Sequence, residues 1–204
     1  LSAPALLPVE VSNNGVDYTS TGVQFVFLAD ASVSSLAPSC GPLSGGTAVT
    51  VRGAGFYRSP ALACRFGLAD AAAVQWLSPS ALVCTAPAAP SGLPGPVPVS
   101  VSNNGQDFAA LGAQLFEFQE PVLVSSLTPA LGRLDGGTAI TLAGSGFAAS
   151  PQLACRFADA FGSPPAVVLA TFVDAAHIVC VSPAGLALQA GAALTVEASN
   201  NGHD

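Results

Sequence analysis

Three copies of one polar segment carry the asparagine and aspartate side chains most able to take part in chemistry. The octet VSNNGQDF begins at residue 101, VSNNGVDY begins at residue 11, and the shorter ASNNGHD begins at residue 198. Such a segment can serve as a catalytic loop, as part of a calcium site or as a structural turn. Calcium needs several oxygen ligands, and each copy supplies a single carboxylate, from Asp17, Asp107 or Asp204.

The asparagine–glycine step inside each copy favours the structural turn. Both residue types tolerate a positive φ, which makes Asn-Gly a strong signal for a β-hairpin. The residue after the glycine differs between the copies (Val16, Gln106 and His203), where shared chemistry would require a constant side chain. We expect the aspartate to accept hydrogen bonds from nearby backbone N–H groups, as in Asx-turns. The predicted turns close the last hairpin of each repeat, and their residues are Asn13, Asn14, Gly15, Asn103, Asn104, Gly105, Asn200, Asn201 and Gly202.

The remaining reactive residues and the charge argue against several classes of function. The net charge is −7 and no lysine is present, so no basic cluster exists to neutralise nucleic-acid phosphates. His177 aligns with an alanine in the other repeat and His203 occupies the variable turn position, so neither is a convincing catalytic base for a cysteine. No apolar run reaches the ~18 residues of a membrane span. We therefore expect no enzyme activity, catalytic residue, cofactor, metal site, nucleic-acid partner or direct membrane insertion.

Internal repetition organises the whole chain. The segment SSLAP at residues 34–38 recurs as SSLTP at residues 125–129, and LACRF at residues 62–66 recurs at residues 153–157, each 91 positions later. A unit of roughly 90 residues is a common size for a small all-β domain. We predict the tail of one unit at residues 1–28, a complete unit at 29–119, and a unit lacking its last strand at 120–204. The chain is accordingly expected to be an internal fragment of a longer protein.

Alternating apolar and polar residues predict β-strands in both longer units. The alternation is clear at residues 47–51, 97–101, 138–142 and 192–196. Glycine and proline interrupt every stretch that might otherwise form a helix. We predict about seven short strands per unit, packed as an all-β sandwich. The linker near residues 119–121 is short and contains Pro121, so the sandwiches should be arranged end to end with little freedom between them.

The order of these motifs resembles the IPT/TIG domain, the immunoglobulin-like unit of plexins, of related receptor ectodomains and of some transcription factors. The second unit carries SSLAPSCGPLSGGT at residues 34–47, then GAGF at residues 53–56, then Cys64 and the segment CTAP at residues 84–87. Several of these motifs occur twice, so the resemblance covers the whole chain. It implies tandem β-sandwiches and no catalytic residues. Repeats that end in SNNG-x-Asp also resemble arrays in large surface proteins of protists and algae.

The five cysteines fall into two repeated pairs and one single residue. Cys64 and Cys84 recur as Cys155 and Cys180, and this recurrence indicates that each pair meets in space. The family resemblance implies an intradomain disulfide in each unit, which indicates an oxidising compartment; buried free thiols are the alternative. Two cysteines without a nearby histidine cannot complete a zinc site. Cys40 has no partner in its unit and is predicted to be an unpaired thiol, although a bridge to another chain stays open.

The expected function follows from repeated domains in which we expect no catalytic or metal site. The chain is predicted to be a structural or adhesive segment of an extracellular or cell-surface protein, a stiff spacer that contacts other repeats and other protein chains. A homopolymeric or surface assembly, a flagellar or ciliary surface, and O-glycans on its Ser-Pro steps all fit this class. The alternatives are an intracellular cytoskeletal or ciliary scaffold with reduced thiols, and the stalk of a receptor ectodomain.

Overall fold

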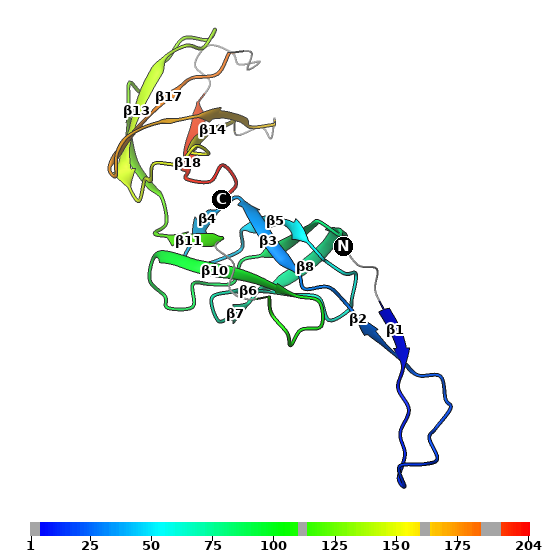
Figure 1. Cartoon of the computed structure of the whole chain (residues 1–204). Helices are drawn as coiled ribbons and strands as arrows, with labels where there is room; N and C mark the ends of the chain where they lie inside the picture. The colour runs from blue at the N-terminus through cyan, green and yellow to red at the C-terminus, as the bar shows by residue number, and fades with distance from the viewer. Residues whose placement is uncertain (1–4, 110–113, 160–163, 185–192) are drawn as a thin grey trace.

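The computed structural model describes residues 5–109, 114–159, 164–184 and 193–204. These residues form strands and connecting loops and no helix, which confirms the all-β prediction. Figure 1 shows three parts in succession along the chain: an extended hairpin, a β-sandwich and a second β-sandwich. The hairpin pairs β1 (Ala5–Pro8) with β2 (Gln24–Phe27) in antiparallel fashion. Below, the second unit means strands β3 to β11 and the third unit means β12 to β18.

The second unit packs a four-stranded sheet against a five-stranded sheet. The first sheet has the order β3 (Ser32–Ala37), β5 (Ala48–Ala54), β9 (Ala81–Thr85) and β8 (Ala73–Ser78). The other has the order β4 (Cys40–Pro42), β11 (Leu115–Gln119), β10 (Gly95–Ser102), β6 (Ala63–Phe66) and β7 (Ala69–Asp70). Side chains alternate along each strand, so that Val49 and Val51 are fully buried while their neighbour Arg52 is exposed. Three edge-to-face phenylalanines, Phe66, Phe116 and Phe118, fill the opposite side of the core.

The third unit repeats this arrangement. Its first sheet has the order β12 (Leu123–Thr128), β13 (Ala139–Ser145), β17 (His177–Val181) and β16 (Thr171–Asp174), and its second has β15 (Ala166–Leu169), β14 (Ala154–Asp159) and β18 (Leu194–Ser199). Both units have a bulge in the first strand and a cis proline after it, at Pro38 and Pro129. The strand predicted at residues 192–196 begins in the structure at Leu194, and residue 192 lies outside the described residues.

The predicted number of strands was too low for the second unit. The structure gives it nine strands, β3 to β11, where about seven were expected. The two shortest, β4 and β7, contain three and two residues. A run of two or three residues is too short to show a period-2 pattern, so these strands become visible only through their pairing with β11 and β6.

Disulfides join the two sheets of each sandwich. Cys64 on β6 is bonded to Cys84 on β9, and Cys155 on β14 is bonded to Cys180 on β17. All four residues are at most 1% exposed. The bridges therefore lie at the centre of each core, where they tie together strands that share no backbone hydrogen bonds.

The glycine-rich motif GAGF lets two strands approach each other closely. A Cβ atom at Gly53 would lie 1.8 Å from the carbonyl oxygen of Ser32, and one at Gly144 would lie 1.9 Å from that of Leu123. No side chain fits at these positions, because the obstacle is backbone. We therefore expect Gly53→Ala to lower the free energy of unfolding by about 3 kcal/mol, through forced separation of β3 and β5.

Urea denaturation of the purified variant checks this prediction. Gly46→Ala is the matched control, because a Cβ atom there meets nothing within 4 Å and the strain comes only from its φ of 93°. That substitution should cost about 1 kcal/mol. Equal losses for the two variants would show that the close approach at Gly53 contributes nothing.

Candidate functional site between the repeats

The three polar octets form the same side-chain-capped turn, which we call the SNNG turn (residues 12–17, 102–107 and 199–204). In the last copy, Oδ1 of Asn201 accepts hydrogen bonds from the backbone N–H groups of His203 and Asp204, at 3.0 and 3.1 Å. Its Nδ2 donates to Oδ2 of Asp204 at 2.6 Å, and Ser199 Oγ donates to Asn201 Oδ1 at 2.9 Å. The same bonds recur around Asn14 and Asn104. The second asparagine therefore organises each turn.

This geometry corrects the expected details of the turn. The glycines Gly15, Gly105 and Gly202 have positive φ, whereas no asparagine among the described residues does. The asparagine accepts the backbone N–H bonds that were expected to reach the aspartate, because its Oδ1 lies over the turn. The aspartate instead accepts from the asparagine amide. The turn begins a long connection between β10 and β11, residues 103–114, and is not itself a two-residue hairpin loop.

The first asparagine of each of the last two copies connects two repeated motifs. Asn103 Nδ2 donates to the carbonyl oxygen of Gly55 at 2.8 Å, and its Oδ1 accepts from the backbone N–H of Tyr57 at 2.9 Å. Asn200 makes the matching bonds to Gly146 and Ala148, at 2.8 and 3.0 Å. The SNNG turn and the Gly-x-Gly-Phe loop are thus held together in both sandwiches.

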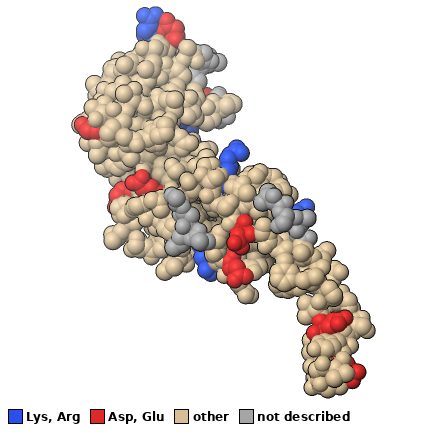
Figure 2. Space-filling model, viewed as in Figure 1, with Lys and Arg blue, Asp and Glu red and all other residues tan. Residues whose placement is uncertain are grey.

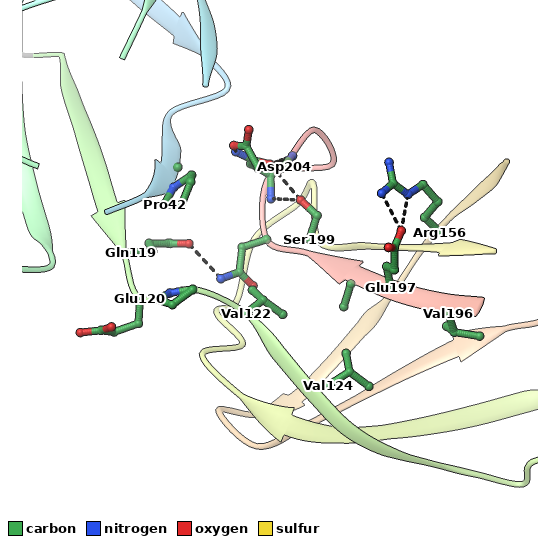
Figure 3. A pocket seen from close by; sticks show the side chains of 15 residues that line it. Pro42, Gln119, Glu120, Val122, Val124, Arg156, Val196, Glu197, Ser199 and Asp204 are labelled. Atoms are coloured by element: carbon green, nitrogen blue, oxygen red, sulfur yellow. Dashed lines mark hydrogen bonds and ion pairs between the residues drawn. The ribbon is translucent and has the colours of Figure 1, made fainter. Parts of the chain in front are cut away.

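The last SNNG turn also binds the preceding unit. Thr47 Oγ1 donates to Oδ2 of Asp204 at 2.6 Å, and Asn201 Nδ2 donates to the carbonyl oxygen of Cys40 at 3.0 Å. A third hydrogen bond runs from Asn200 Nδ2 to Oε1 of Gln119 at 3.0 Å, and Figure 3 shows it beside the linker. We call these six residues the inter-repeat interface. Figure 1 shows the chain end tucked between the two sandwiches, above β4.

Most residues of the inter-repeat interface are buried. Thr47 is 1% exposed, Asn201 3%, Cys40 6% and Asn200 7%. No buried side-chain nitrogen or oxygen atom among the described residues lacks a hydrogen-bond partner. Because a hydrogen bond to a carboxylate is worth about 1.5–3 kcal/mol, the Thr47–Asp204 bond is the strongest single contact here.

Gly41 makes room for this arrangement in the second unit. A Cβ atom at Gly41 would lie 2.2 Å from Thr47 Oγ1 and 2.9 Å from the ring of Phe116. Any larger residue would push the threonine hydroxyl out of the position from which it donates to Asp204. The site that receives the turn, here called the acceptor site, therefore consists of the Cys40 carbonyl, Gly41, the Thr47 hydroxyl and Gln119.

Cys40 is the free thiol of the chain, and it is buried at the inter-repeat interface. Burial raises the pKa of its thiol, and the negative charges of Glu117 and Asp204 raise that pKa further. A raised pKa keeps the sulfur protonated and unreactive near neutral pH. The residue thus packs as a small apolar group, and its backbone carbonyl is what binds the turn.

A cleft of about 520 Å³ opens beside the inter-repeat interface. Its walls come from the linker residues Gln119, Glu120 and Pro121 and from the third unit, with the ion pair of Arg156 and Glu197 at its rim (Figure 3). A matching cleft of about 760 Å³ lies between the hairpin and the second unit. Within the described residues, no three His, Cys, Asp or Glu side chains are close enough to hold a metal ion together. The side chains that converge here bind one another through the Arg156–Glu197 ion pair and the Asn200–Gln119 hydrogen bond.

The molecule carries few charges, since only 8% of its residues are charged. Charged side chains are few and scattered over the face shown in Figure 2, with no basic patch on that face. Among the described residues, no helix is long and apolar enough to cross a membrane.

No residue type or motif in the sequence directly indicates the acceptor side of the interface. Thr47, Gly41 and Gln119 carry no chemistry by type, and Thr47 is 157 residues from Asp204. The available signal was the repeat itself, because Gly132 and Thr138 stand where Gly41 and Thr47 do, with the same spacing. A glycine and a threonine that recur in both units need a reason, and contact with a neighbouring unit is one.

Two linked sandwiches with a disulfide across each core define the class of protein: a tandem array of immunoglobulin-like domains. The family model for the IPT/TIG domain matches residues 31–118 and 121–203, so the chain belongs to the IPT/TIG domain family. This confirms the resemblance seen in the sequence.

Plexins are among the relatives of this chain. It is 31% identical over 166 residues to plexin-A2 of Mus musculus, covering 81% of this chain and 8% of that protein. It is 28% identical over 158 residues to plexin-A3 of Homo sapiens, covering 74% of this chain and 8% of that protein. The structure of the plexin A4 full extracellular region shares the fold, with a TM-score of 0.56 and 21% identity over 85% of this chain and 14% of that one. The chain thus spans less than a tenth of the length of these curated relatives.

Proposed function

We propose that the chain is a non-enzymatic spacer in the extracellular part of a cell-surface protein, in which the inter-repeat interface fixes the angle between successive units. The observation that carries this proposal is the last SNNG turn, which hydrogen-bonds to the acceptor site of the preceding sandwich. A spacer needs stiff units and stiff connections. The disulfides across each core supply the first, and the interface together with the short linker at Pro121 supplies the second.

The relatives support an extracellular location. The chain aligns with plexins, and a structure that shares its fold is a plexin extracellular region. Two disulfides fit the oxidising conditions outside the cell. The intracellular scaffold alternative requires five reduced thiols, and a non-reducing mass of the natural protein distinguishes the two cases.

The stiffness of the inter-repeat interface can be measured as a distance distribution. Spin labels at Leu68→Cys and Val167→Cys, two exposed positions in different units, report the separation of the sandwiches in a Cys40→Ala background. We expect one narrow distribution. Thr47→Val with Asn201→Ala removes two of the three hydrogen bonds across the interface, and it should broaden the distribution about twofold, because free relative motion is the default for weakly joined domains.

Ser125→Ala is the matched control, because Ser125 bonds within its own unit, to the carbonyl oxygen of Ala143. It should leave the distribution unchanged. A broad distribution in the parent protein, or no change in the double variant, would rule out a spacer held by this interface.

A further inference from the structure

We infer that the exposed SNNG turn at residues 12–17 binds an acceptor site of the same kind on another IPT/TIG unit, as residues 199–204 bind that of the second unit. This inference rests on the proposed function, because it extends the same interface to a second contact. It assigns a partner to a surface that the described contacts leave uncovered: Asn13, Asn14, Gly15, Val16 and Asp17 are all exposed.

The turn at residues 12–17 already has the bound conformation. Asn14 Oδ1 accepts from the backbone N–H groups of Val16 and Asp17, both at 2.9 Å, and Asn14 Nδ2 donates to Asp17 Oδ2 at 2.7 Å. Gly15 N–H donates to Ser12 Oγ at 2.9 Å, as Gly202 N–H does to Ser199 Oγ in the bound copy. Because the turn is formed before contact, binding need not order it, and preorganised loops lose less affinity on binding.

The groups that make the contact in the bound copy are available in this one. A side-chain amide nitrogen has two protons, and Asn14 uses one of them for Asp17. The other corresponds to the proton that Asn201 donates to the Cys40 carbonyl. The Asp17 carboxylate corresponds to that of Asp204, which accepts from Thr47. The donor and the acceptor therefore stand in the same positions on the same turn.

The acceptor site recurs as well, which defines the chemistry of the partner. In the third unit, Gly132 and Thr138 match Gly41 and Thr47, and a Cβ atom at Gly132 would again lie closest to the threonine hydroxyl, at 3.2 Å. Thr138 Oγ1 accepts from the backbone N–H of Arg133 at 3.2 Å, and its own proton can be donated to a carboxylate. The expected partner is thus a sandwich with a Gly-x5-Thr segment at its edge.

The binding experiment uses Cys40 as the reporter, in three full-length variants. The receiver carries Asn201→Ala and Asp204→Ala, which frees its acceptor site and uncovers Cys40. The donor carries Cys40→Ala and Asp107→Ala, so that residues 12–17 are its only free turn with an aspartate. The control donor adds Asp17→Ala, a single change at an exposed position. The measurement is the rate at which a maleimide modifies Cys40 of the dilute receiver.

We expect the donor to slow this modification about fivefold at roughly 1 mM, a concentration in the range that a linker provides between neighbouring domains. The control donor should leave the rate unchanged. Equal slowing by both donors, or slowing by neither, would overturn the inference and leave the interface intact. A receiver whose Cys40 reacts no faster than that of the parent protein would overturn the inter-repeat interface itself.

Discussion

Removal of the Cys155–Cys180 disulfide should unfold the third unit well before the second. We expect Cys155→Ala with Cys180→Ala to lower the free energy of unfolding of that unit by about 3–4 kcal/mol, since the bridge closes a loop of 25 residues and constrains the unfolded chain. Within the described residues, the core of the third unit contains eight buried residues against thirteen in the second. The smaller core supplies less hydrophobic stabilisation to offset the loss of the disulfide.

The fluorescence of the single tryptophan reports on the unfolding of the second unit alone in this experiment. Trp76 lies on β8 of the second unit, where its Nε1 donates to the carbonyl oxygen of Phe56. In urea, tryptophan fluorescence should keep its midpoint in the Cys155/Cys180 variant, while circular dichroism at far-ultraviolet wavelengths shows an additional early transition. Cys64→Ala with Cys84→Ala should instead lower the fluorescence midpoint. The prediction fails if both pairs of substitutions move that midpoint equally, because the bridges would then not act within their own units.

The β-sandwich could be predicted from the sequence because the signals for it lie within short segments and occur in both units. Alternation at residues 47–51 and the recurrence of the cysteine pairs each report on one unit, and a copy 91 to 96 residues later supports each interpretation. The same locality explains the errors. β4 consists of three residues and is defined by its pairing with β11, more than 70 residues further along the chain. The detail of the SNNG turn depended on which of two neighbouring polar side chains folds over the backbone, and composition does not decide that.

The inter-repeat interface lay beyond sequence reasoning for a different physical reason. Two of its three hydrogen bonds join residues more than 150 positions apart, the third joins residues 81 apart, and each partner has an unremarkable residue type. The variable residue of the turn, His203, makes no side-chain hydrogen bond to the rest of the turn among the bonds of the described residues. The recurring residues beside it, Asn201 and Asp204, were interpreted as part of a structural turn, because their second role appears only when another unit is placed against them.

Opening the inter-repeat interface should expose the buried thiol at its centre. We expect Asp204→Ala to increase the rate of Cys40 modification by a maleimide at least about tenfold, the factor that corresponds to losing one hydrogen bond of about 1.5 kcal/mol to a carboxylate. The substitution also lowers the Cys40 pKa, because it removes the Asp204 charge and exposes the thiol to water, and both burial and that charge raise the pKa in the parent protein. A larger fraction of the sulfur is then thiolate at a given pH, which further increases the modification rate.

The pH dependence distinguishes exposure from this change in ionisation. A raised pKa in the parent protein means that its modification rate keeps rising with pH above the range in which an ordinary thiol has already ionised. In Asp204→Ala the rise should come at lower pH and reach a higher plateau, because the site is also more accessible. His203→Ala is the control, since its side chain is exposed and its hydrogen bond to Asn201 comes from the backbone N–H, which the substitution keeps. If His203→Ala and Asp204→Ala accelerate modification equally, general loosening of the chain end explains the effect, and the carboxylate has no special role in joining the two units.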